Sequence, residues 1–223
     1  MDSYIPPYTI SDKMLEQVAS ISEKVGRITS HRELESKPHL RRNNRIRSIH
    51  SSLKIEANSL SLNEVRDVIN GHYVVGDHKE IQEVKNAYAA YEKISEIDPS
   101  SLSDLKKIHG ILTHLTVEES GEFRKGDEGV FSGGKCIFVA PPSHMVSGLI
   151  KSLLSWVKTS EGIVHPLIMA AVFHYDFVFI HPFYDGNGRV GRLILMKECL
   201  ANNVMPFIIT DRFDYMYKKT LNQ

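Results

Sequence analysis

Apolar residues recur at intervals of three and four along most of this chain, which is the spacing of amphipathic helices. Ser11 stands before one such stripe, formed by Met14, Leu15, Val18, Ile21 and Val25, and is a good N-cap. Pro38 opens a second stripe, and the pair Ser61 and Glu64 has the spacing of a capping box. The same pattern predicts helices at about 38–56, 61–71, 79–97, 103–115, 144–157, 166–180, 193–200 and 211–222.

One segment departs from the helical pattern. Residues 130–132 and 135–139 are rich in β-branched and aromatic side chains and flank Gly133 and Gly134, which suit a two-residue turn. Pro141 and Pro142 close the segment. The fold class predicted is therefore mostly α, a helical bundle with one β-hairpin.

Composition narrows the functional classes. Hydrophobic residues make up 42% of the 223, enough for a sizeable core, and 27 basic residues balance 27 acidic ones. With no net charge we do not expect general nucleic-acid binding, and the arginines between 41 and 47 favour a solvated face. The most apolar stretch, 167–183, is interrupted by polar residues, and no signal peptide is recognisable. We expect a cytoplasmic protein without a membrane segment.

The segment from His181 to Arg192 has the properties of a phosphate site. Pro182 ends the preceding helix, and Gly186, Asn187 and Gly188 permit a tight turn close to a ligand. The next helix then begins with unpaired N–H groups that point into the loop. Such a helix start binds anions.

The charged residues of this segment suit nucleotide chemistry. Arg189 and Arg192 lie three residues apart and suit phosphate oxygens, while Asp185 offers a hard ligand for Mg²⁺. His181 titrates near neutrality and suits a general base. For any one of these residues an ordinary structural loop remains the alternative. Their occurrence together within twelve residues favours a catalytic site.

The segment matches His-Pro-Phe-x-Asp-Gly-Asn-Gly-Arg-x-x-Arg at every fixed position, and so resembles the signature of the Fic family. The resemblance extends from about Ser51 onward, and residues 105–124 look like the stretch before the family's flap. It implies a Fic-type helical bundle whose flap is the hairpin. It also implies transfer of AMP from ATP to a Ser, Thr or Tyr hydroxyl of a protein, with release of pyrophosphate.

The resemblance further implies a role for each residue. His181 would be the general base and Asp185 would hold Mg²⁺. ATP would be bound by Gly186, Asn187, Gly188, Arg189, Val190, Gly191 and Arg192, with Tyr217 on the adenine side. Glycine at 188 favours AMP transfer, since a lysine there marks the related Doc-type kinases. The flap residues Val130, Phe131, Gly133, Gly134 and Lys135 would dock a target segment by strand pairing.

A second motif resembles the inhibitory sequence of the family. Ser52 and Glu56 are four residues apart on one helix face, and the resemblance implies that Glu56 pairs with Arg192 and keeps ATP from binding productively. Ala57 departs from the Gly or Asn of the motif, which leaves the geometry of this helix end open. We divide the chain into an N-terminal helical region with the inhibitory helix, 1–75, and a Fic catalytic core, 76–223.

Several alternatives remain open from sequence. They are removal of AMP or transfer of another phosphate-bearing group, and a non-catalytic nucleotide-sensing module. Self-modification and a homodimer are open too, and so is the target. The last helix normally continues in the family, so we expect a chain truncated at its C-terminus. The spacing of His109, His114, His165 and His174 fits no zinc site, and packing roles are expected for them.

Overall fold

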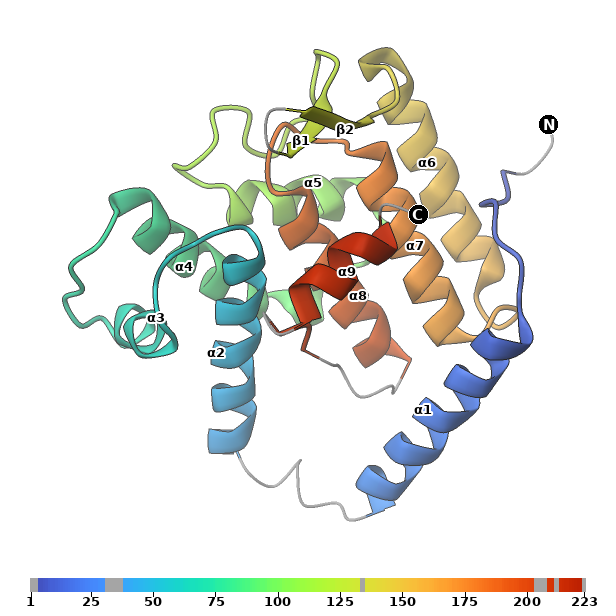
Figure 1. Ribbon diagram of the computed structural model, residues 1–223, viewed down its shortest axis with the longest axis horizontal. Helices are drawn as coiled ribbons and strands as arrows, with labels where there is room; N and C mark the ends of the chain where they lie inside the picture. The colour runs from blue at the N-terminus through green and yellow to red at the C-terminus, as the bar shows by residue number, and fades with distance from the viewer. Residues whose placement is uncertain (1–3, 31–37, 133–134, 203–207, 211–212, 222–223) are drawn as a thin grey trace.

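The computed structural model describes residues 4–30, 38–132, 135–202, 208–210 and 213–221. Their order along the chain is shown by colour in Figure 1. The elements are α1 (Asp12–Ser30), α2 (Pro38–Ile55), α3 (Leu62–Ile69), α4 (His78–Glu92), the short 3₁₀ helix η1 (Ile94–Glu96), α5 (Leu102–Leu112), β1 (Gly129–Ser132), β2 (Lys135–Val139), α6 (Ser143–Ser160), α7 (Pro166–Ile180), α8 (Asn187–Ala201) and α9 (Asp214–Leu221). The predicted mostly α class with one hairpin is confirmed.

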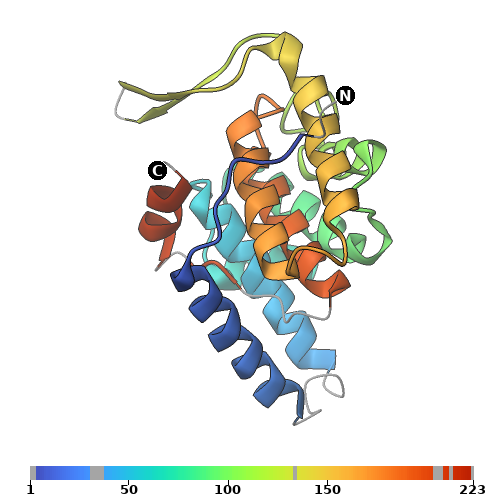
Figure 2. The same cartoon turned by 90° about the vertical axis from the view of Figure 1, so that its right-hand side faces the viewer.

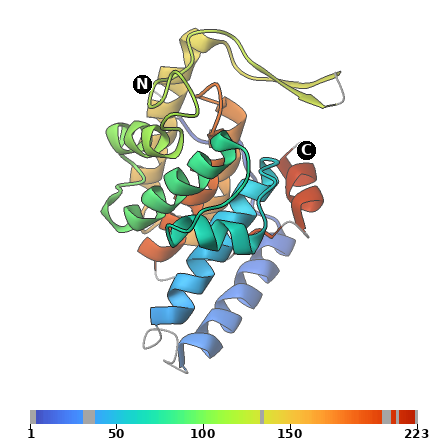
Figure 3. The ribbon, with the colours of Figure 1, turned by 90° about the vertical axis from the view of Figure 1, so that its left-hand side faces the viewer.

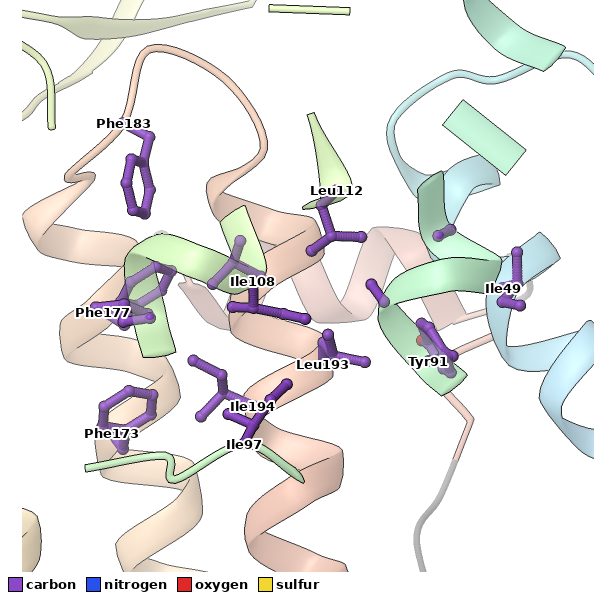
Figure 4. Packing of buried hydrophobic residues seen from close by; sticks show 14 of the residues in the cluster. Ile49, Tyr91, Ile97, Ile108, Leu112, Phe173, Phe177, Phe183, Leu193 and Ile194 are labelled. Atoms are coloured by element: carbon purple, nitrogen blue, oxygen red, sulfur yellow. The ribbon is translucent and has the colours of Figure 1, made fainter. Parts of the chain in front are cut away.

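Helices α7 and α8 lie side by side at the centre of the molecule (Figure 1). Helix α6 packs on α7, whereas α5 packs against α4 and α8, and α2 and α3 cover α4. Figure 4 shows how side chains from these helices meet, with Phe173 and Phe177 of α7 facing Leu193 and Ile194 of α8. All four are fully buried, so the loop between α7 and α8 stands on a rigid base.

Local signals explain most helix boundaries. Ser61 and Glu64 form both hydrogen bonds of the predicted capping box, and α7 begins at Pro166 as expected. Helix α4 ends earlier than predicted, at Glu92, because the N–H of Lys93 bonds three residues back and the chain continues as a 3₁₀ turn.

The start and end of α5 also differ from the prediction. Its N-cap is Ser101, whose hydroxyl accepts from the N–H of Asp104, and the expected cap Ser103 lies inside the helix. Leu115, which we expected on the helix, lies beyond its end in a left-handed conformation and is 77% exposed. The sequence offers two serines at this helix start, and the hydroxyl of the first one caps the helix.

Helix α1 follows the predicted stripe only in part. Met14 and Val18 line an apolar cavity that α7 and α9 close from the other side. Ile21 lines the same cavity but is 41% exposed, and Leu15 is 53% exposed. Figure 2 shows α1 below the central helices, with the preceding residues running up along α7.

The hairpin projects from the helical body above the side on which α9 lies (Figures 2 and 3). Val130 pairs with Phe138 and Ser132 with Lys135, and the register shifts between Val130 and Phe131. Gly133 and Gly134 lie outside the described residues. Among the helices that the structure describes, none is both long and apolar enough to cross a membrane.

Candidate active site

The loop between α7 and α8 is shaped by two left-handed residues. Helix α7 ends because His181 adopts φ 49° and ψ 59°, and Pro182 has no N–H to continue the helix. Gly186, at φ 83°, turns the chain again and is the N-cap of α8. A non-glycine residue in this conformation is strained, and such strain is typical of functional sites.

The Asn187 side chain is hydrogen-bonded to the backbone of this loop. It is buried, accepts from the N–H of Phe183 at 3.0 Å and donates to the Phe183 carbonyl at 2.7 Å. The amide side chain therefore holds the loop closed and is not directed at a ligand. Gly186 has no side chain, so the first N–H groups of α8 receive no side-chain bond from the N-cap residue. These groups give α8 the anion-binding start that the sequence predicts.

His181 is the first residue of this loop, directly after α7, and is partly buried. Burial lowers the pKa of its imidazole, and the charge of Arg124 lowers it further. A backbone contact with Val178 and the carboxylates of Glu128 and Glu56 act in the opposite direction. The net shift keeps the ring neutral at physiological pH, which is the form that accepts a proton.

Arg189 is enclosed between two carboxylates. Its guanidinium lies 3.1 Å from Glu83 of α4 and 2.9 Å from Asp185 of the loop, and only 3% of the side chain is exposed. Although burial acts in the opposite direction, Arg189 holds the pKa of the Asp185 carboxyl below its usual value. Asp185 is therefore anionic and half exposed at the edge of the loop.

Arg192 reaches the end of α2. It donates to the Ser52 hydroxyl at 3.0 Å, to the Ser52 carbonyl at 2.9 Å and to the Glu56 carboxylate at 2.7 Å. Burial would lower the pKa of this guanidinium, but Glu56 and the phenol of Tyr217 outweigh it and raise the pKa. The structure thus brings together Ser52, Glu56 and Arg192, which are far apart in the sequence.

The geometry of the end of α2, which the sequence leaves open at Ala57, is a regular one. The N–H of Asn58 bonds to the Leu53 carbonyl at 3.1 Å and the N–H of Ala57 to the Lys54 carbonyl at 3.0 Å. This is the Schellman arrangement, in which the residue after the helix is left-handed. Ala57 adopts it at φ 66°, so alanine occupies a position that suits glycine or asparagine.

The Glu56 carboxylate lies directly against the start of α8. A side chain at Gly188 would collide with Glu56 Oε1 and come within 2.9 Å of Arg192 Nη1. The absence of a side chain at Gly188 therefore makes room for an anionic group on this turn. In the structure, the chain's own carboxylate fills that place.

Tyr217 of α9 closes the site on another side. Its hydroxyl lies 2.9 Å from His174 Nε2 and 3.5 Å from Arg192 Nη1. Burial lowers the pKa of His174 to about 4, so this imidazole is neutral. The expected contact between Tyr217 and adenine stays a prediction. In this structure the phenol lies beside the guanidinium that pairs with Glu56.

The residues fit a Mg²⁺ ion that is bound jointly with phosphate. No group of three or more His, Cys, Asp or Glu side chains suited to a metal occurs among the described residues. Asp185 instead offers a single carboxylate, and its Oδ1 accepts from Arg189 and from the N–H of Gly186 at 2.5 Å. Mg²⁺ commonly binds through one carboxylate together with substrate phosphates, so this donor set is adequate.

For two residues of the site the sequence predicted no contact with the catalytic loop. Glu83 is one of many charged residues on an amphipathic helix, yet it binds Arg189 and also accepts from the Asn58 amide at 3.0 Å. His109 accepts from the N–H of Gly121 through Nδ1, and its Nε2 donates to the Asp185 carbonyl at 3.0 Å. Its ring stacks on Phe183, which confirms the expected packing role.

Comparisons with known proteins identify the family of the chain. Residues 99–198 match the model of the Fic/DOC family. Protein adenylyltransferase Fic of Aedes aegypti is 32% identical over 181 residues, covering 77% of this chain and 35% of that protein, and the Culex quinquefasciatus protein of the same name gives the same figures. The chain spans about a third of the length of these curated relatives.

Solved structures share the fold. A Fic family protein from Desulfovibrio desulfuricans G20 superposes with a TM-score of 0.83 at 42% identity, over 98% of this chain and 62% of that one. Fic-1 from C. elegans gives 0.72 at 25% identity, over 94% and 66%. The chain therefore belongs to the Fic/DOC family, with the family domain at residues 99–198.

Proposed function

We propose that this chain transfers AMP from ATP to a hydroxyl group of a protein. The observation that carries the proposal is that the buried guanidinium of Arg192 and the start of α8 meet at one small volume beside Gly188, while the buried Arg189 is the next residue of the same helix. Two buried guanidinium groups and a helix N-terminus bind a chain of phosphates. Glu56 now fills part of this volume.

The proposed reaction gives each of these side chains a role. The phosphate chain lies on the first turn of α8, with Arg189 and Arg192 compensating its charge. The target hydroxyl oxygen attacks the α-phosphorus, its proton passes to the neutral imidazole of His181, and the bond to the β-phosphate breaks so that pyrophosphate leaves. Mg²⁺ bound to Asp185 would compensate phosphate charge during this step.

The hairpin supports a docking role. In the described part of the chain β1 pairs only with β2, so each strand has an outer edge that faces no other strand. An extended target segment would add to such an edge through main-chain hydrogen bonds, as predicted for Val130, Phe131 and Lys135. The hairpin projects above the site, which favours this use (Figure 2).

We also propose that residues 1–75 regulate the core, 76–223, through Glu56. A carboxylate 2.7 Å from Arg192 competes with the outer phosphate of ATP for the same guanidinium. The Glu56 side chain lies outside the last turn of α2 and is 37% exposed, so it leaves the site without unfolding the core.

The test is incubation of purified chain with labelled ATP and Mg²⁺, followed by intact mass. Glu56→Gly is expected to gain the mass of one AMP group on itself or on added protein, and the further change His181→Ala to reduce this by roughly 10²–10⁴. Glu118→Gly removes the same charge from an exposed turn and is the control.

Each alternative has its own outcome in this experiment. Reversible ATP binding without transfer supports the nucleotide-sensing module. A gain of phosphate alone supports transfer of a terminal phosphoryl group, and loss of AMP from a modified protein supports the reverse reaction. Equal transfer by the parent chain and Glu56→Gly overturns the inhibitory role of Glu56.

A further inference from the structure

Arg124 lies between α5 and β1, and only 2% of it is exposed. Its Nε donates to the His181 carbonyl at 2.7 Å and its Nη1 to the Gly126 carbonyl at 2.9 Å. Its Nη2 donates to the carbonyls of Ile180, at 3.3 Å, and Pro141. One buried guanidinium thus binds four backbone oxygens from three segments of the chain.

These oxygens belong to the parts that the proposed reaction must bring together. Ile180 and His181 end α7, where carbonyls lack helical partners and a cation is favourable. Gly126 stands before β1 and Pro141 follows β2. The side chain therefore spans both legs of the hairpin and the turn that carries the base.

Other bonds in the described part of the chain also hold the base of the hairpin, such as that from the N–H of Arg124 to the Pro182 carbonyl at 2.9 Å. Its two legs are joined at the base by the bond from Ala140 N–H to the Glu128 carbonyl, at 3.0 Å. The Tyr184 hydroxyl accepts from the N–H of Gly126 at 2.8 Å, and Phe138 contacts the ring of Phe179 with centroids 5.3 Å apart. Among the described residues, the Arg124 side chain bonds to both legs and to the His181 carbonyl.

The choice of arginine at this position is informative. Its four described acceptors are all carbonyl oxygens. The carboxylates of Asp127 and Glu128 affect the pKa of its guanidinium through their charge. Only a planar fork with five donors reaches four such acceptors at once, which lysine and the neutral amides cannot do.

We propose that Arg124 is a positioning residue that fixes the His181 imidazole relative to the docking edge of the hairpin. This role rests on the proposed transfer of AMP to a protein hydroxyl. Without the guanidinium, fewer bonds would join the turn at His181 to the two hairpin legs, chiefly those from the N–H of Arg124 to the Pro182 carbonyl, at 2.9 Å, and from the N–H of Gly126 to the Tyr184 hydroxyl. A displacement of about 1 Å at such a site costs roughly 10²-fold in rate.

The charge of Arg124 gives a second, independent readout. Burial is the main cause of the lowered pKa of His181, and Arg124 adds to it, whereas Glu128 and Glu56 oppose it. Replacing Arg124 by a neutral residue is therefore expected to raise the pKa of His181. Replacing it by lysine keeps the charge and should leave the pKa nearer to its starting value.

The experiment compares Arg124→Gln and Arg124→Lys with Lys125→Met, all in the Glu56→Gly chain. Lys125 is the exposed neighbour, and its replacement removes the same charge without touching the four carbonyls. Two readouts need no transfer activity: NMR titration of the His181 ring, assigned with His181→Ala, and hydrogen exchange of the amides of β1 and β2. The third is the ratio of AMP placed on protein to free AMP formed from ATP.

In both Arg124 variants we expect the amide hydrogens of the hairpin to exchange faster than in Lys125→Met. We also expect protein modification to slow, by roughly 10²-fold in Arg124→Gln. Only Arg124→Gln should raise the pKa of His181. If Arg124→Gln unfolds, Arg124→Lys decides through amide exchange and the product ratio. The inference is overturned if a folded Arg124 variant matches Lys125→Met in exchange and product ratio. If amide exchange changes but no chain transfers AMP, the proposed function is contradicted. The role of Arg124 in holding the hairpin to the turn at His181 is then still supported.

Discussion

Two glutamates face two arginines on the first turns of α8, and their surroundings differ. Glu83 extends from the middle of α4 to Arg189, is 12% exposed and is also held by the Asn58 amide. Glu56 extends from just beyond the end of α2 to Arg192 and is 37% exposed. The same ion pair is therefore part of the fold in one case and a contact at a helix end in the other.

The difference matters because the energetic value of an ion pair depends on burial. An exposed pair contributes about 0–1 kcal/mol, whereas breaking a buried pair leaves a charge without compensation. Glu83 thus behaves as a fixed counterion of Arg189. Glu56 can be exchanged for another anion at Arg192 at little cost to the fold.

The largest effect is expected at Glu83. Replacing Glu83 by leucine leaves the buried Arg189 with only Asp185 and should lower the free energy of unfolding by about 3–5 kcal/mol. Glu83→Gln keeps an acceptor for Arg189 and should cost about 1–2 kcal/mol. Urea denaturation measures both values.

The matched variant is Glu56→Leu, for which we expect a smaller loss than for Glu83→Leu, because the buried Arg192 keeps its two bonds to Ser52. Equal losses at the two positions would show that Glu56 is as much a part of the fold as Glu83. That outcome would remove the basis for the proposed exchange of Glu56 for phosphate.

Acid should destabilise the protein through buried histidines on both sides of the site. Burial lowers the pKa of His174, beside Tyr217, and of His109, beside Asp185, to about 4 from 6.5. Since the folded state holds these rings neutral, their contribution to the free energy of unfolding is complete above pH 6.5. It is lost as the pH falls from 6.5 towards 4. The loss is on the order of 2–3 kcal/mol for each fully buried ring.

Unfolding measured between pH 7 and pH 4 tests this expectation. His174→Gln, which keeps a polar group beside Tyr217, should show a shallower fall in stability than the parent chain. His109→Gln should do the same on the Arg189 side. A parent chain whose stability is constant over this range would show that neither ring is held neutral.

The end of α2 offers a smaller effect of opposite sign. Ala57 lies at φ 66°, a conformation that costs an alanine about 1 kcal/mol and that glycine adopts freely. Ala57→Gly should therefore stabilise the chain by about 0.5–1 kcal/mol. Ala89→Gly, on the exposed face of α4, should destabilise it by about 1 kcal/mol. Losses of equal size at both sites would contradict the Schellman arrangement at Ala57.

The sequence predicted the parts of this molecule that depend on neighbours along the chain. The capping box of α3, the proline at the start of α7 and the glycine turn at Gly186 are local signals, and the structure has them all. The family signature from His181 to Arg192 was likewise contiguous, so the family and the fold are confirmed. The roles of His181 and Asp185 in transfer stay predictions.

The rest depended on contacts between distant segments. Glu83 and Arg189 are separated by 106 positions, and Arg124 and His181 by 57. No spacing rule within one helix relates such residues, because their meeting is decided by how α4, α7 and α8 pack. The pairing of Glu56 with Arg192 was expected only because a resemblance supplied it.

The smallest expected effect concerns how α9 holds the end of α2. Lys218 donates to the Ile55 carbonyl at 3.0 Å, one of the last carbonyls of the helix that precedes Glu56, and pairs with Asp214 at 3.0 Å. A cation at a helix C-terminus contributes about 0.3–1 kcal/mol, and this side chain is 52% exposed. Lys218→Met should lower the free energy of unfolding by about 0.5 kcal/mol, whereas Lys219→Met, an exposed neighbour, should leave it unchanged. In the parent background Lys218→Met should also raise AMP transfer slightly, because the Glu56 segment is less firmly held. Equal behaviour of the two lysine variants would show that α9 does not stabilise the pairing of Glu56 with Arg192.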